Sequence, residues 1–294
     1  MMKKTLAFIL ALLLVLPLCA CEKETDGDNA VATASNNVYS VATYKELKEA
    51  KGFDDGDIIV MSGYYSSNDG GGGRFAYKAS GEYTENGGTV ITAADGGTFV
   101  RLCADNERNI LWFGAKPGDS GDDGAAIEAA VNSLPATGGT VVCPGGEYTL
   151  FDTLNIGNGD SASTASAING IKLIGDGGFY GTVFKAAQKF DVLMSVNGSM
   201  TDLTVDGIEL NCDLKVNTAL ELNSVRNSSF TNLYLFQYLE SGMLLQSGGT
   251  KASNISENNS FLNVTVISLA NTEGITCIDI GGDYDTGKPV TNCT

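Results

Sequence analysis

The chain has 294 residues, with 35 acidic against 18 basic side chains, a formal net charge of -17 and no histidine. The length suits one large domain or two small ones, and a hydrophobic content of 43% can fill a core. The lack of histidine excludes Ser-His-Asp and Cys-His catalysis and histidine-ligated zinc. The negative charge argues against nucleic acid as a partner, because a phosphate backbone is bound by clustered Lys and Arg.

The segment 1–20 is typical of a secretory signal peptide. Two lysines precede an apolar run over residues 6–16, and Leu18-Cys-Ala-Cys21 follows. This ending resembles a bacterial lipobox, in which Cys21 carries the lipid; a plain secreted protein cleaved nearby is the alternative. Residues 21–37 are small and polar, so we expect a flexible tether. The predicted location is extracytoplasmic, with a lipid anchor in the bacterial cell membrane or at the cell surface.

Residues 38–110 are predicted to form a small β-rich head domain. Thr43 and Glu46 have capping-box spacing and predict a short helix. Four short strands are expected at 58–61, 74–77, 89–91 and 99–102, separated by Gly and Asp turns. Asp69 begins a run of four glycines between two of them. We expect a tight turn there, because the Lys-Ser/Thr of a phosphate-binding loop is absent.

Residues 112–148 predict a turn, a helix, a second turn and a buried strand. Asp122 or Asp123 can cap a helix over 123–134. Its apolar positions follow the helical spacing i, i+3, i+4 and i+7. They are Ile127, Ala130, Val131 and Leu134.

This segment resembles the entry motif of the pectate lyase superfamily, which includes polygalacturonase-like and tailspike-like β-helices. The matching positions are Phe113-Gly-Ala, Gly118-Asp119, Asp122-Asp123, Ala126-Ile127, Gly138-Gly139, Val141, Pro144, Gly146 and Tyr148. The resemblance implies an all-β fold: a right-handed parallel β-helix over 111–294, with the helix at 123–134 as an N-terminal cap. It also implies a polysaccharide partner. The head looks like the domain that precedes such helices in some phage tailspikes.

Short apolar strands recur after residue 190 in two series. In the second series Leu203, Leu233, Val264 and Cys293 follow one another at nearly equal intervals, which is typical of a solenoid. We expect Asn232, Asn263 and Asn292 to stack as an amide ladder. Thr294 falls inside this series without a polar cap, so we expect the chain to be the N-terminal part of a longer β-helix.

Three groups of carboxylates are candidate site residues on the outward face of the coils. Glu221 and Asp279 align in one column about 9.6 Å apart at Cα, near the separation of an inverting glycosidase, and are the predicted catalytic pair. Asp206 and Glu209, with Asp213 nearby, are predicted to bind substrate. Asp283 and Asp285 follow Asp279 with a spacing that can collect Ca²⁺. No cofactor is otherwise required.

Two functions stay open at this point. The first is a cell-surface lipoprotein that hydrolyses or eliminates glycosidic bonds of an acidic glycan. The alternative is a non-catalytic glycan-binding, adhesin or spike-like β-helix. The alternative is favoured by the lack, after residue 160, of the Asn-Thr-Asp, Asp-Asp, Gly-His-Gly and Arg-Ile-Lys motifs of polygalacturonase-like members. The expected partners are a polysaccharide and, through the lipid, a membrane, and the expected assembly is a monomer or homotrimer.

Overall fold

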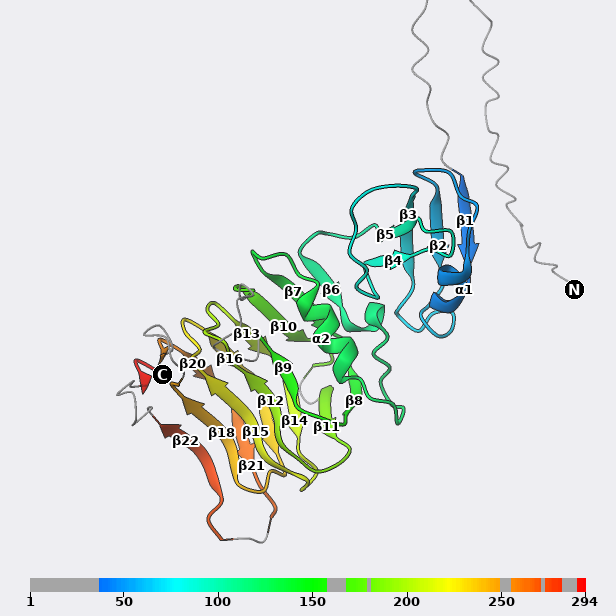
Figure 1. Ribbon diagram of the computed structural model, residues 1–294. Coiled ribbons are helices and arrows are strands. Elements are labelled where there is room, and N and C mark those ends of the chain that lie inside the picture. Colours follow the sequence, from blue (N-terminus) through cyan, green and yellow to red (C-terminus); the bar gives the residue numbers. More distant parts are fainter. Residues whose placement is uncertain (1–36, 158–167, 179–180, 249–254, 271–272, 282–289) are drawn as a thin grey trace, which may run out of the picture. The chain divides into compact units, whose positions relative to one another are not determined.

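The computed structural model describes residues 37–157, 168–178, 181–248, 255–270, 273–281 and 290–294 (Figure 1). Within these ranges the chain is mostly β-structure, with two short α-helices and one 3-10 helix. The strands form a five-stranded head sheet, three parallel sheets of six, five and five strands, and one two-stranded sheet. No helix in the described part is long and apolar enough to cross a bilayer. The predicted all-β parallel β-helix is confirmed.

The head sheet has the strand order β1-β2-β3-β5-β4, with β1 parallel to β2 and the other pairs antiparallel. The strands of the sheet are β1 (Val38–Val41), β2 (Ile58–Met61), β3 (Gly73–Lys78), β4 (Val90–Thr92) and β5 (Thr98–Arg101), and helix α1 (Tyr44–Glu49) lies between β1 and β2 in the chain. The four predicted strands are present. Alternation along them buries Ile59, Phe75 and Phe99 against Leu47 of α1. Thr43 caps α1 as predicted, since its Oγ1 accepts the Glu46 N–H at 3.3 Å.

The glycine run forms the predicted turn and has a second role in packing. The Asp69 carboxylate holds the loop by accepting four backbone N–H groups, those of Tyr64, Tyr65, Ser66 and Gly71. A Cβ at Gly73 would clash with Nη1 of Arg101. The absence of side chains therefore lets the buried Arg101 guanidinium reach the backbone of the loop.

Three parallel sheets form the faces of the β-helix, and each coil contributes one strand to each sheet (Figure 1). The first sheet contains β6 (Glu107–Asn109), β7 (Gly139–Cys143), β10 (Ile171–Gly175), β13 (Thr204–Asp206), β16 (Ser229–Thr231) and β20 (Ser260–Leu262). The second contains β8 (Gly146–Leu150), β11 (Thr182–Ala186), β14 (Ile208–Asn211), β17 (Tyr234–Phe236) and β21 (Thr265–Ile267). The third contains β9 (Leu154–Ile156), β12 (Phe190–Val196), β15 (Val216–Asn223), β18 (Ser241–Gln246) and β22 (Thr276–Gly281). β19 (Ser256–Glu257) pairs with β23 (Val290–Thr291).

The coils differ in length, which corrects the predicted alignment of Leu203. The alignment of Cys293 with Val264 is also wrong, because Cys293 lies two residues after Thr291, which pairs with Glu257. Leu210 pairs with Leu235, and Leu235 pairs with Val266, so the later of these two coils is the longer one. The predicted match of Leu233 with Val264 therefore holds. Leu203 was wrongly matched to Leu233, because Thr204 pairs with Ser229 and the coil between them is shorter than the predicted repeat.

The asparagine ladder exists, but it occupies two corners instead of one. Asn263 donates to Oδ1 of Asn232 at 2.8 Å, as predicted. Asn292 was wrongly placed above them: it follows Thr291, which pairs with Glu257, so it lies in register with Asn258. Asn258 in turn donates to Asn227 at 3.2 Å. All five asparagines have φ between 51° and 55°, a left-handed bend that Asn tolerates better than most residues.

Helix α2 (Gly124–Asn132) covers the first coil and lies within the predicted 123–134. Ile127, Ala130 and Val131 are buried, and the helix contacts β6 and β9. Asp123 stands at its N-cap position but makes no capping bond. Its carboxylate instead accepts the N–H groups of Lys116 at 2.6 Å and Thr149 at 2.8 Å, so it joins the entry turn to β8.

We expect Asp123 to make the fold more stable at pH 5 than at pH 7. Burial raises the pKa of Asp123 to about 6. The negative charges of Asp119 and Asp122 also raise it, while the two backbone hydrogen bonds lower it. A folded-state pKa above the unfolded value of about 3.9 means that protonation favours folding, so this stability is lost as the pH rises through about 6. In Asp123→Asn, thermal melting should therefore show a smaller difference between pH 5 and pH 7. Asp105→Asn, at an exposed turn, is the control, and an unchanged pH difference in Asp123→Asn would contradict the assignment.

Candidate functional site

The predicted catalytic pair lies in one outward column of the third sheet. Register pairs Ser195 with Glu221, Glu221 with Leu244, and Leu244 with Asp279. Glu221 points outward because its neighbours Leu220 and Leu222 are fully buried. The predicted alignment of Glu221 and Asp279 is thus present, with about 9.6 Å between their Cα atoms two coils apart.

Hydrogen bonds from the neighbouring coils orient the Glu221 carboxylate. Ser195 Oγ donates to Oε2 at 3.2 Å, and Gln246 Nε2 donates to Oε1 at 2.6 Å. Asn197 donates to Ser195 Oγ at 3.3 Å and extends the network. These hydrogen bonds fix the direction of the carboxylate. Because Glu221 is only half-buried, a ligand can still reach it from the outer side.

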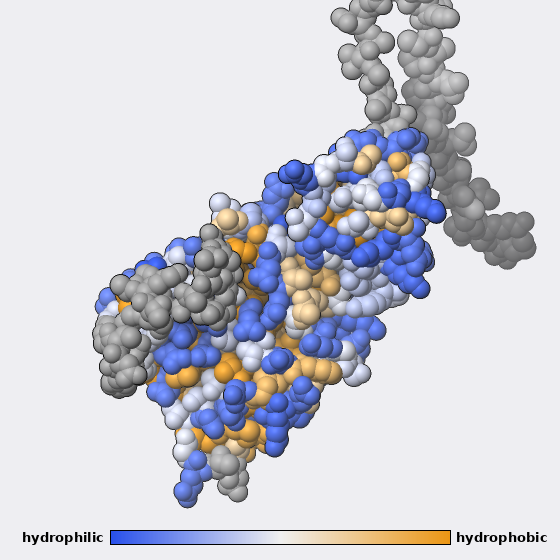
Figure 2. All heavy atoms as spheres, viewed as in Figure 1, coloured by the Kyte–Doolittle hydropathy of each residue, from blue (hydrophilic) through white to orange (hydrophobic). Residues whose placement is uncertain are grey.

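A second column of outward residues, next to the Glu221 column, is polar. Asn223 pairs with Gln246, and Asn197 occupies the equivalent position one coil earlier, after the Val196–Leu222 pair. Amide groups supply donors and acceptors at the spacing of the strands. Asp279 is exposed on β22 at the far end of this face, and half-buried Leu244 separates it from Glu221. Figure 2 shows apolar residues interspersed with hydrophilic ones over the strands labelled β12 to β22 in Figure 1.

Asp206 and Glu209 are not brought together, although both were predicted to bind substrate. Asp206 ends β13 in the first sheet, and Glu209 points outward from the second sheet. Gly207 lies between them with φ 72°, so the chain turns a corner there. The two carboxylates therefore face different sides of the β-helix.

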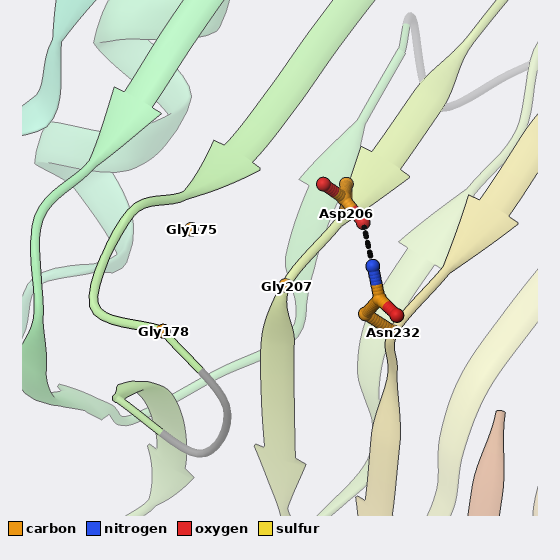
Figure 3. Close-up of a pocket in the computed structure, with 5 residues that line it drawn as sticks. All are labelled: Gly175, Gly178, Asp206, Gly207 and Asn232. Atoms are coloured by element: carbon orange, nitrogen blue, oxygen red, sulfur yellow. Dashed lines mark hydrogen bonds between the residues drawn. The ribbon is translucent and has the colours of Figure 1, made fainter. Parts of the chain in front are cut away.

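Asp206 lines a pocket of about 260 Å³ near a glycine-rich bend (Figure 3). Its Oδ1 accepts hydrogen bonds from Thr231 Oγ1 at 2.5 Å and from Asn232 Nδ2 at 2.7 Å. Figure 3 shows Asp206 and Asn232 pointing toward one another, with Gly207 beside them and Gly175 and Gly178 farther to the left. Those hydrogen bonds make Asp206 part of the corner structure as well as of the pocket.

Glu209 is half-buried on the second sheet, near Glu147 and Lys185, which sequence reasoning did not single out, and the predicted Asp213 lies on the same side. Burial raises the pKa of Glu209; the hydrogen bond from Asn211 Nδ2 at 3.1 Å lowers it, and the nearby Glu147 raises it further. Glu147 pairs with Lys185 at 3.3 Å, and Lys215 pairs with Asp213 at 2.6 Å. The alternation of apolar and polar residues in strands β8, β11 and β14 indicates which side chains point outward. Only the register between the strands shows that these side chains lie on one face.

The remaining predicted site residues lie outside the described residues. These are the metal candidates Asp283 and Asp285 and the lipidation candidate Cys21. Among the residues that the structure does describe, no group of three or more His, Cys, Asp or Glu side chains could hold a metal ion.

Comparison with known proteins finds a matching family model for each of two parts of the chain. The family model of a rhamnogalacturonase A/epimerase, pectate lyase-like domain matches residues 107–293, more than half of the chain. The chain belongs to this pectate lyase-like family. A model of a small four-stranded β-sheet domain of phage tail proteins matches residues 40–104. The predicted resemblance to the pectate lyase superfamily is therefore confirmed.

The relatives of this pectate lyase-like chain include proteins named for action on polysaccharides. Alginate lyase 7 of Azotobacter vinelandii is 35% identical over 124 residues, which are 37% of this chain and 14% of that protein.

Two solved structures share the fold, each with a TM-score of 0.52. WceF of Pantoea stewartii, a glycan biofilm modifying enzyme with a tailspike-like parallel β-helix, is 15% identical over 83% of this chain and 40% of its own. Tailspike gp49 of the Acinetobacter baumannii bacteriophage Fri1, a capsular polysaccharide depolymerase, is 16% identical over 87% of this chain and 52% of its own. The chain thus spans about half or less of each of these relatives.

Proposed function

We propose that this protein cleaves glycosidic bonds of an acidic polysaccharide along the outward face of the third sheet. The observation that carries the proposal is the carboxylate of Glu221, whose direction is fixed by hydrogen bonds from the Ser195 hydroxyl and the Gln246 amide. Family membership and the polysaccharide-acting relatives support the general class of substrate.

The chemistry requires one group that accepts a proton and one that donates it. We assign the acceptor to Glu221, because two hydrogen bonds hold its carboxylate in one orientation. In hydrolysis it would take a proton from the attacking water; in elimination it would take the proton next to the uronate carboxyl group. We assign the donor to Asp279, which would protonate the departing glycosidic oxygen. The separation of about 9.6 Å at Cα is compatible with a water between them, as in inverting glycosidases.

The proposed setting is the bacterial cell surface, with the chain held by a lipid on Cys21. The support is the lipobox-like Leu18-Cys-Ala-Cys21 and the small, polar residues that follow it. Incorporation of a labelled fatty acid in the wild-type chain and its loss in Cys21→Ser would test this anchor.

The test of the function is incubation of the purified protein with alginate, polygalacturonate and iota-carrageenan, with and without Ca²⁺. We expect new reducing ends with at least one polymer. Ultraviolet absorbance of a new double bond would identify elimination, and its absence would identify hydrolysis. Retention of the protein on these polymers without new ends in any of them would contradict cleavage and favour the non-catalytic glycan-binding function.

A further inference from the structure

The outward face of the second sheet carries a regular two-column array of side chains. Each of the four strands β8, β11, β14 and β17 supplies two outward residues that flank one buried residue. Register aligns them as Glu147 and Thr149 on β8, Val183 and Lys185 on β11, Glu209 and Asn211 on β14, and Tyr234 and Phe236 on β17. With strands about 4.8 Å apart, these four coils span about 14 Å along the β-helix.

One end of the array is aromatic. The Tyr234 and Phe236 rings stack with centroids 5.2 Å apart and an interplanar angle of 22°. They point outward, because Leu235 between them is fully buried. Both are only half-buried; their neighbours in register are Glu209 and Asn211 on β14 and Thr265 and Ile267 on β21. Val183 and Ile267 are the other apolar residues that point outward on this sheet, and an aromatic pair among mostly polar outward residues is typical of a surface that contacts a ligand.

The other end of the array is a pocket of about 320 Å³ lined by ion pairs. Lys185 and Glu147 line it with Lys215 and Asp213, and Asp119 reaches it from the entry turn. In a chain of net charge -17, the described coils from residue 111 onward hold six basic side chains. Three of them lie at or beside this pocket: Lys116, Lys185 and Lys215.

These two ends match the two surfaces of a sugar residue. The C–H face of a pyranose ring packs on an aromatic ring, while its hydroxyl groups need both donors and acceptors. Paired lysines and carboxylates supply both kinds of partner in fixed positions, and Asn211 supplies both between them. The array runs along successive coils, so it can contact several successive units of one polymer.

We propose that the second sheet is a polysaccharide-binding surface, separate from the Glu221 face. One sugar ring stacks on Tyr234 and Phe236, and the next units bind Asn211, Lys185 and Glu147 through their hydroxyl groups. This surface holds the polymer whether or not the third sheet cleaves it, so the proposal goes beyond the proposed function.

The test is electrophoresis of the folded protein in native gels that contain alginate, polygalacturonate or dextran at several concentrations. We expect the wild type to be retarded in at least one gel. Tyr234→Thr/Phe236→Thr, which keeps β-favouring residues at both positions, should raise the Kd at least about tenfold, or about 1.4 kcal/mol. Lys185→Gln should weaken binding in the same gel, and it changes no core residue.

Tyr83→Thr is the matched control, because Tyr83 is an aromatic residue of the head that is 43% exposed. It should bind as the wild type does, and thermal melting should show that every variant is folded. Glu221→Gln should remain retarded even though it loses cleavage, which separates this proposal from the proposed function. Equal retardation of the wild type and the Tyr234/Phe236 variant would overturn the proposal, as would a wild type that none of the gels retards.

Discussion

Glu221→Gln should lower the rate of polysaccharide cleavage by at least about 100-fold, the lower end of what a positioned proton acceptor contributes. The amide has nearly the same shape and can still accept the hydrogen bond from Ser195, so the third sheet should keep its structure. An amide cannot take up the proton that the reaction releases, so the loss should appear in the rate of the chemical step. Initial rates of reducing-end formation, with melting temperature as the folding check, measure it.

The matched control for Glu221→Gln is Glu240→Gln. Glu240 is exposed and lies just before β18, outside the Glu221 column. We expect this variant to retain wild-type rates, and Asp279→Asn to lose activity with Glu221→Gln. Wild-type rates in Glu221→Gln would exclude the third-sheet assignment, and Glu209, a half-buried carboxylate beside Glu147, would be the next candidate to test.

Replacement of Arg101 by Leu should lower the free energy of unfolding by about 3 kcal/mol or more. The Arg101 side chain is 6% exposed and donates to three carbonyl oxygens, those of Gly71, Gly72 and Gly88. Its guanidinium also packs over the rings of Phe75 and Trp112, 4.5 and 4.7 Å from their centroids. Burial lowers the pKa of Arg101 to about 10, so the group stays charged at neutral pH. Leucine would leave the three carbonyls, two of them buried and that of Gly72 partly buried, without this donor.

The control for Arg101 is Arg74→Leu, an exposed arginine on the neighbouring strand β3. We expect it to change stability by less than about 0.5 kcal/mol. Arg101→Lys should be nearly as destabilising as Arg101→Leu, because an ammonium group cannot reach the three carbonyls in the geometry of the planar guanidinium. Urea unfolding of the three variants tests this, and a loss below about 1 kcal/mol in Arg101→Leu would contradict it.

The motif at residues 113–148 predicted the beginning of the β-helix well, because local contacts determine which residue type fits at its positions. Asp123 is fixed by the two N–H groups that it accepts, and Tyr148 by burial in the first coil. The Glu221 column was also predictable, because Leu220 and Leu222 alternate with it in a half-buried strand.

The later coils could not be aligned by residue type alone. Asparagine fits the left-handed bend at both corners, so nothing local distinguishes Asn258 from Asn263 as the partner of Asn292. Unequal coil lengths follow from corner loops that tolerate insertion, and a fixed repeat therefore misplaced Leu203. The second-sheet surface escaped prediction for the same reason, since its contacts join short strands whose register only the structure provides.

The most direct test of polysaccharide cleavage is light scattering of polymer molar mass during incubation with the protein. We predict that the molar mass of alginate, polygalacturonate or iota-carrageenan falls steadily with the wild type and stays constant with Glu221→Gln. An unchanged molar mass of all three polymers with the folded wild type would contradict cleavage at the Glu221 face, as would an equal fall with both proteins.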